Sequence, residues 1–241
     1  MLRKIPHLIT LLNLLCGCAA LVFAFQQQFL AVFACIFVGG LADWGDGLVA
    51  RLLNVKSELG KELDSLADMT TFGIVPGAVL YQLLSLHSGD APAEEGLSLL
   101  AMPGFTVSLF AAYRLAKFNL DTRQTESFIG LPTPSCTAFV VGLMLIYEFD
   151  TFGLGEWVTH PGFLYPITII LSYLLIAELP MFSLKFKNAH WKGNEVRFTF
   201  IILAVILLIT IQEATFSLMV ILYVLFSLVD NLRNRRLTQA S

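Results

Sequence analysis

The chain has 241 residues, of which 56% are hydrophobic and 14% charged, and its formal net charge is −3 at pH 7. Its mean hydropathy is +0.75. Because about a quarter of the residues in soluble domains are charged, this composition excludes an ordinary soluble protein. Most of the chain is therefore expected to have lipid as its solvent.

Apolar runs near the roughly 20 residues that a membrane-spanning helix needs recur along the whole sequence. The last two are short and separated only by Gln212 and Glu213. The eight runs cover residues 6–25, 29–51, 60–86, 97–120, 134–149, 163–184, 196–211 and 214–229. This pattern predicts an all-α, polytopic integral membrane protein of about eight helices, folded as a single domain over residues 1–241.

Lysine and arginine test this count, because short cytoplasmic loops retain positive charge and translocated loops lack it. With a cytoplasmic N-terminus, all 15 basic residues fall at cytoplasmic helix ends or loops. They are Arg3, Lys4, Arg51, Lys56, Lys61, Arg114, Lys117, Arg123, Lys185, Lys187, Lys192, Arg197, Arg233, Arg235 and Arg236. An odd number of helices would break the pattern, so both termini are predicted to be cytoplasmic.

The first apolar run has two interpretations. Arg3 and Lys4 precede it, and residues 22–24 resemble the cleavage site of a signal peptide. A membrane helix is favoured, because the run is long for a signal and carries a polar face formed by Thr10 and Asn13. These two side chains could contact a nucleotide or could form hydrogen bonds between helices.

Carboxylates inside membrane spans are energetically costly and call for a functional explanation. At about 100° per residue, Asp43 and Asp46 share one face of the second helix, and Asp64 and Asp68 share one face of the third. The short connection makes these helices antiparallel neighbours. The acids are therefore expected to meet as two pairs, about 6 to 12 Å from the cytoplasmic helix ends.

Four carboxylates this close cannot all stay ionised unaided. Two divalent cations would balance the charge, and oxygen ligands without histidine or thiolate nearby favour Mg²⁺ or Mn²⁺. Two such ions are suited to clamping a phosphoryl group during in-line displacement. The acids therefore predict a metal-dependent phosphoryl-transfer site.

Small and basic residues flank the acids in a way that suits a diphosphate substrate. Gly47, Ala50 and Gly60 leave the helix surfaces bare, so a nucleotide could approach the backbone there. Arg51 offers a planar fork for phosphate oxygens. Alternatively, the small residues only let the helices pack closely. Their position beside the acids favours a role in substrate binding over a role in helix packing.

Residues 43–68 resemble a known signature, D-x2-D-G-x2-A-R-x8-G-x3-D-x3-D, at all eight of its fixed positions. This is the signature of the CDP-alcohol phosphotransferase family. The resemblance implies that the four acids hold a di-metal centre and that the last of them, Asp68, is the general base. It also implies contacts to the CDP moiety from Gly47, Ala50, Arg51 and Gly60.

Outside the signature, residues 5–13, 62–69, 72–73, 113–119 and 130–134 are similar to membrane-embedded phosphatidylserine synthases. Two positions depart from those relatives: Lys117 stands where they often have arginine, and His7 where they often have asparagine. The resemblance implies CDP-diacylglycerol and L-serine as substrates, contact with membrane lipids, a homodimer, and no nucleic-acid partner. The absence of a targeting extension suits a prokaryotic inner membrane, with the site facing the cytoplasm.

Arg114 and Lys117 lie one helical turn apart at the cytoplasmic end of the fourth predicted helix. An L-serine acceptor brings a carboxylate, which these two cations could bind. They could instead be ordinary positive-inside residues or contacts to lipid phosphate. Glycerol 3-phosphate and inositol phosphate remain alternative acceptors, although a phosphate-bearing acceptor would be expected to need more basic residues.

A divalent-cation transporter would also place acids among membrane helices. Transporter sites usually lie near the bilayer midplane at broken helices. Here the acids cluster toward one face, and the small residues and Arg51 beside them would serve no purpose for a bare ion. The sequence therefore favours an enzyme over a transporter.

Overall fold

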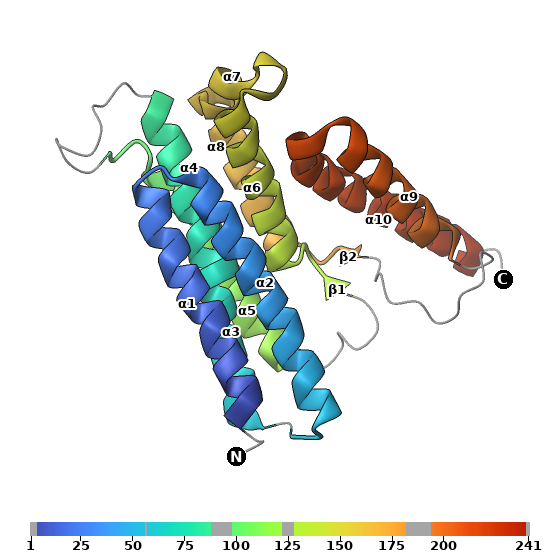
Figure 1. The fold of residues 1–241 in the computed structure, drawn as a ribbon. Helices are drawn as coiled ribbons and strands as arrows, with labels where there is room; N and C mark the ends of the chain where they lie inside the picture. Colours follow the sequence, from blue (N-terminus) through green and yellow to red (C-terminus); the bar gives the residue numbers. More distant parts are fainter. Residues whose placement is uncertain (1–3, 56, 88–97, 122–127, 182–193, 240–241) are drawn as a thin grey trace.

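The computed structural model describes residues 4–55, 57–87, 98–121, 128–181 and 194–239, and it is almost entirely helical (Figure 1). The longer helices are α1 (Ile5–Phe25), α2 (Phe29–Leu52), α3 (Glu58–Asp68), α4 (Val75–His87), α5 (Thr106–Leu120), α6 (Thr133–Phe149), α8 (Pro161–Ile176), α9 (Glu195–Thr210) and α10 (Thr215–Gln239). Shorter elements are the π-helical η2 (Met69–Ile74), the 3-10 turns η3 (Met102–Phe105), η4 (Thr151–Gly153) and η5 (Gln212–Ala214), helix α7 (Gly155–Thr159), and strands β1 (Phe128–Ile129) and β2 (Pro180–Met181).

Helices α1 and α2 form an antiparallel hairpin along one side of the molecule (Figure 1). The buried Gly39 of α2 lies at their interface. A Cβ atom at Gly39 would lie 3.1 Å from the side-chain oxygen of Asn13. Small side chains allow helix backbones to approach this closely, as is typical of membrane helices. The polar face of α1 is thereby brought against α2.

Helices α3 and α4 form one helical stretch, Glu58–His87, interrupted by the π-helical turn η2. Ser57 caps the N-terminus of α3, because its hydroxyl accepts a hydrogen bond of 3.0 Å from the amide of Gly60. Helix α4 is buried from Val75 to Leu84, whereas Ala67 is the one buried residue in α3. Thus α4 belongs to the core and α3 is a more exposed extension of it.

Helix α6 is the other central element, buried continuously from Phe139 to Ile146. Helices α9 and α10 form a hairpin that packs on α6 (Figure 1). The approach is close at Gly142, where a Cβ atom would lie 2.5 Å from the amide nitrogen of Ser217. The hydroxyl of Ser217 also donates to the carbonyl of Phe139 over 2.8 Å. The hairpin is therefore attached to the scaffold through buried contacts.

A helix forms in each of the eight predicted segments. Within the described residues, four stretches are long and apolar enough to cross a membrane by length and composition: Ile5–Phe25, Phe29–Leu52, Glu58–His87 and Gln212–Val229. The shorter apolar helices are Thr133–Phe149, Pro161–Ile176 and Arg197–Thr210. The count of eight crossings, the cytoplasmic termini and the single domain stay predictions. Among the residues used for them, Arg3, Lys56, Leu97, Arg123, Lys185, Lys187 and Lys192 lie outside the described residues.

The predicted end of the sixth segment, at residue 184, is wrong. Helix α8 ends at Ile176, and Ala177 is already extended, with ψ of 137°. Pro180 cannot continue a helix and favours an extended residue before it. It begins β2, which pairs antiparallel with β1. Hydropathy does not reveal this boundary, because residues 177–181 are still largely apolar.

Candidate metal and nucleotide site

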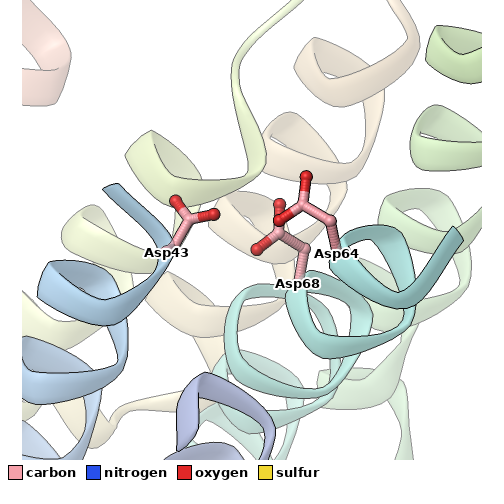
Figure 2. Close-up of side chains that lie close together, drawn as sticks. All are labelled: Asp43, Asp64 and Asp68. Carbon is pink, nitrogen blue, oxygen red and sulfur yellow. The ribbon is translucent and has the colours of Figure 1, made fainter. Parts of the chain in front are cut away.

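Three of the four predicted acids form a cluster between α2 and α3. Asp43 comes from α2, and Asp64 and Asp68 come from successive turns of α3. Figure 2 shows their side chains pointing toward one another. Each offers a carboxylate oxygen, and these three oxygens lie within 4.8 Å of one another. The predicted juxtaposition of the two helices therefore holds for these residues.

The chemistry of this cluster fits a divalent cation. Its donors are all carboxylate oxygens, which are the ligands that Mg²⁺ and Mn²⁺ prefer. Asp64 Oδ1 is buried and has no hydrogen-bond partner among the described residues. Three carboxylates at this separation repel one another, and a bound cation would offset that repulsion. The geometry does not fix the number of ions, so the pair of cations stays a prediction.

Asp46, the fourth predicted ligand, faces a different neighbour. Its side chain is buried and accepts a hydrogen bond from the hydroxyl of Thr10 on α1. The same hydroxyl lies 3.0 Å from the carbonyl of Pro6. Asp46 lies outside the three-carboxylate cluster. It lines a cavity beside the acids, and Asp64 lines the same cavity. Its role as a metal ligand stays a prediction.

Asn13 lies against one acid of the cluster, Asp68. Its amide nitrogen donates to Asp68 Oδ1 over 3.3 Å, and its side chain is fully buried. Its own Oδ1 has no hydrogen-bond partner within the described part of the chain. Asn13 thus orients an acid of the cluster, and the predicted contact between Asn13 and a nucleotide remains untested.

A cavity of about 690 Å³ opens beside the acids, between the beginning of α1, the end of α2 and the beginning of α3. Its volume falls within the roughly 300 to 1,000 Å³ typical of small-molecule sites. The predicted residues that line it are Thr10, Asp46, Gly47, Ala50, Arg51, Gly60 and Asp64. Every residue proposed to contact the CDP moiety, except Asn13, therefore lies on this cavity.

Sequence reasoning missed other residues on the same cavity. His7 Nε2 lies 3.1 Å from the hydroxyl of Ser57, the residue that caps α3. Lys61 also lines the cavity, and its ammonium group donates to the carbonyl of Asn119 over 3.0 Å. Ser57, three residues before Gly60, could have been recognised from the sequence as the N-cap of a helix. His7 stood out in the sequence only as a departure from the relatives, and its contact with Ser57 depends on the packing of α1 beside α3.

Arg114 and Lys117 have different environments. Arg114 is buried, its Nε has no hydrogen-bond partner among the described residues, and its guanidinium carbon lies 5.9 Å from the ring centre of Phe118. Lys117 is half-buried and forms an ion pair of 3.2 Å with Glu178. Both line a space of about 10 Å³. That space suits at most one water, so the predicted serine carboxylate site is not formed here as an open cavity.

Comparison with known proteins identifies relatives of this chain. The family described as CDP-alcohol phosphatidyltransferase matches residues 3–174. A Mycobacterium leprae protein named CDP-diacylglycerol–serine O-phosphatidyltransferase is 34% identical over 187 residues, which are 75% of this chain and 58% of that protein. Proteins of the same name from Bacillus subtilis and Helicobacter pylori are 32% and 30% identical. The matches cover 74% and 77% of this chain, and 89% and 74% of those proteins.

Proposed function

The chain belongs to the CDP-alcohol phosphatidyltransferase family, and on that premise we propose that it is a phosphatidylserine synthase. In the proposed reaction, the hydroxyl oxygen of L-serine attacks the lipid-side phosphorus of CDP-diacylglycerol. The bond from this phosphorus to the bridging oxygen breaks, and CMP leaves. The printed name of the relatives supports this choice of substrates. The observation that carries it in this chain is the carboxylate cluster beside a nucleotide-sized cavity.

The cavity would receive the cytidine diphosphate while the acyl chains remain in the bilayer. Gly47 leaves open space on α2, because the nearest atom to a Cβ placed there would be Arg51 Nη2, at 4.0 Å. A nucleotide could therefore contact the backbone at Gly47, with the guanidinium of Arg51 binding phosphate oxygens. Gly60 and Ala50 lie on the same cavity. This arrangement would direct the diphosphate toward the acids.

The carboxylates of Asp43, Asp64 and Asp68, joined by Asp46, would hold two divalent cations, either Mg²⁺ or Mn²⁺. When bound, such ions would neutralise the diphosphate and stabilise the departing CMP. We assign Asp68 as the base that accepts the proton of the serine hydroxyl. Its Oδ1 accepts a hydrogen bond from Asn13, which orients the carboxylate. The proton would pass to Asp68 as the new phosphorus–oxygen bond forms.

Arg114 is the better of the two predicted residues for binding the serine carboxylate. Its guanidinium is buried with an unpaired Nε, whereas the charge of Lys117 is already balanced by Glu178. A buried guanidinium forms strong, directional bonds to a carboxylate. Serine binding would require the small space at Arg114 to widen. We further propose a homodimer in a prokaryotic inner membrane, with the site facing the cytoplasm.

The proposal is tested by measuring CMP release from CDP-diacylglycerol by the purified protein with Mg²⁺ or Mn²⁺. L-serine, glycerol 3-phosphate and inositol phosphate are compared as acceptors. Release stimulated by serine alone, with phosphatidylserine as product, is expected. Stimulation by one of the other acceptors would retain the family and overturn the choice of serine. Absence of release with all three would contradict the proposed activity and favour a cation-transport role.

A further inference from the structure

The helix that carries Asp64 and Asp68 changes geometry immediately after Asp68. It is π-helical from Met69 to Ile74 and returns to α-helix at Val75. A π-helical turn contains an extra residue, and one residue corresponds to about 100° of rotation in an α-helix. The π turn η2 therefore sets the angle between the acidic face of α3 and the faces of α4 that pack in the core.

Of these two helices, α4 is the one whose orientation is fixed by packing. Val75, Val79 and Leu80 of α4 are each 0% exposed, whereas α3 buries only Ala67. If η2 became a regular α-helix, core packing would hold α4 in place and α3 would rotate. A rotation of about 100° would turn Asp64 and Asp68 away from Asp43. The cluster therefore depends on the π geometry of η2.

In the part of the chain that the structure describes, three buried hydroxyl groups hold η2, each through a hydrogen bond between this turn and a different helix. Ser108 on α5 donates to the carbonyl of Gly73 over 2.8 Å. Thr137 on α6 donates to the carbonyl of Phe72 over 2.9 Å, and the same hydroxyl lies 3.0 Å from the carbonyl of Thr133 in its own helix. Within η2, Thr71 donates to the carbonyl of Asn13 on α1 over 3.0 Å.

The contact with α1 also links η2 to the acids. A Cβ atom at Gly17 would lie 2.5 Å from the hydroxyl of Thr71, so glycine permits this approach. Asn13 accepts the hydrogen bond of Thr71 with its backbone and donates to Asp68 with its side chain. The conformation of η2 is thus connected to the position of Asp68 through two consecutive hydrogen bonds.

We propose that Ser108 and Thr137 are positioning residues, which hold the π turn Met69–Ile74 and thereby aim Asp64 and Asp68 at the metal site. This inference rests on the proposed function, in which the acids bind divalent cations. Neither residue belongs to the carboxylate cluster or lines the nucleotide cavity. Both act through backbone carbonyls of the turn that follows Asp68. Groups that hydrogen-bond metal ligands directly commonly affect metal affinity about 10- to 100-fold, and we expect the lower end of this range for supports that act through the backbone.

The test compares Ser108→Ala, Thr137→Val and the double variant with a matched control, Thr215→Val. Thr215 is also a fully buried threonine that donates to a carbonyl of another helix, that of Leu207 over 2.8 Å, but in the α9–α10 hairpin. Mn²⁺ binding to the purified full-length protein is measured from the electron paramagnetic resonance signal of free Mn²⁺. The Kd is expected to rise about tenfold or more in the Ser108 and Thr137 variants. It should be unchanged in Thr215→Val and near the wild-type value in Thr137→Ser.

Hydrogen exchange of the amides in residues 69–74 provides a second readout that does not depend on metal. Exchange should be faster in Thr137→Val and Ser108→Ala than in Thr215→Val. Unchanged exchange, or tight Mn²⁺ binding by the folded double variant, would overturn the inference. If the double variant does not fold, Ser108→Ala alone decides by the same criteria. If the wild-type protein does not bind Mn²⁺, the metal centre is wrong, and hydrogen exchange still decides whether these hydroxyls hold the turn.

Discussion

At the scale of single residues, the site depends on which neighbour each acid faces. Asp43 faces the two acids of α3, whereas Asp46, three positions later, faces Thr10. Asp68 differs from the others because Asn13 donates to one of its oxygens. This hydrogen bond orients the carboxylate. This contact is the reason for which we propose Asp68, rather than Asp43 or Asp64, as the general base.

Replacing Asp68 with asparagine is expected to lower the rate of CMP release about 10²- to 10⁴-fold, the range for loss of a general base. Binding of CDP-diacylglycerol should be largely preserved, because the amide retains the shape of the carboxylate and the cavity does not include Asp68. Turnover and lipid–nucleotide binding are measured separately. Glu156→Gln, an exposed change in α7 at the other end of the molecule (Figure 1), serves as the control. Near-normal turnover in Asp68→Asn would remove Asp68 from the role of base.

The two glycines of the cavity give a paired prediction. A Cβ atom at Gly47 meets open space, so Gly47→Ala should preserve or increase stability, since alanine favours a helix over glycine by about 0.5 to 1 kcal/mol. Its KM for CDP-diacylglycerol should nevertheless rise if the nucleotide contacts the backbone there. At Gly60 a Cβ atom would lie 3.1 Å from Ser57 Oγ and 3.3 Å from His7 Nε2, so Gly60→Ala should also disturb the helix cap.

These variants are compared by thermal unfolding in detergent and by steady-state kinetics. Gly47→Ala with both unfolding temperature and KM unchanged would show that α2 does not contact the nucleotide at this position. Gly60→Ala as stable as the wild-type protein would show that Ser57 and His7 move aside without loss. The pair thus separates loss of ligand binding from loss of packing.

At the scale of whole elements, the sequence predicts helices well and their interruptions poorly. Apolar runs locate a helix in each of the eight segments, and the i to i+4 spacing of Asp64 and Asp68 correctly places both on one face. The π turn η2 could not be predicted, because nothing in the local pattern of Met69–Ile74 marks an extra residue in the helix. The hydroxyls that hold it lie in helices 35 and 65 residues further along.

The end of α8 escaped prediction for a similar reason. It is defined by pairing of β2 with β1, a segment that precedes it by about 50 residues. Gly130, directly after β1, has φ of +76°, and its amide donates to the carbonyl of Leu179 over 2.9 Å. The contact of Asp46 with Thr10 could not be predicted, because periodicity along α2 identifies the faces of the helix but not the face that α1 covers. Long-range contacts, rather than local pattern, decide these three features.

Gly130→Ala is therefore expected to loosen the end of α8. A Cβ atom there would lie 2.8 Å from the carbonyl oxygen of Leu175 and would also occupy a left-handed backbone, which costs about 1 to 2 kcal/mol by itself. Gly153→Ala is the control, because Gly153 has φ of +70° with nothing within 4 Å of the added atom. The unfolding temperature should fall further for Gly130→Ala. An equal fall in unfolding temperature in the two variants would mean that the carbonyl groups beside Gly130 move aside without loss of stability.

At the scale of the whole molecule, the acids lie where the α1–α2 hairpin meets the exposed helix α3, while α4 and α6 form the buried scaffold (Figure 1). The match to the family ends at residue 174, so β2, α9 and α10 lie beyond it. Three carboxylates, one from α2 and two from α3, meet where these helices face each other. Metal binding should therefore affect the stability of the fold as well as its chemistry.

Removal of divalent cations should destabilise the wild-type protein and make it less stable than the Asp43→Asn variant. Without metal, the three facing carboxylates repel one another, and asparagine at position 43 relieves part of that repulsion. With EDTA, Asp43→Asn should therefore unfold at a higher temperature than the wild-type protein. With saturating Mg²⁺ or Mn²⁺ the wild-type protein should be the more stable of the two, because a ligand at 100 times its Kd stabilises a folded protein by about 2.7 kcal/mol.

Glu156→Gln, whose carboxylate lies outside the cluster, should behave as the wild-type protein in both conditions. If the unfolding temperatures of wild type and Asp43→Asn respond equally to metal, Asp43 does not contribute to cation binding.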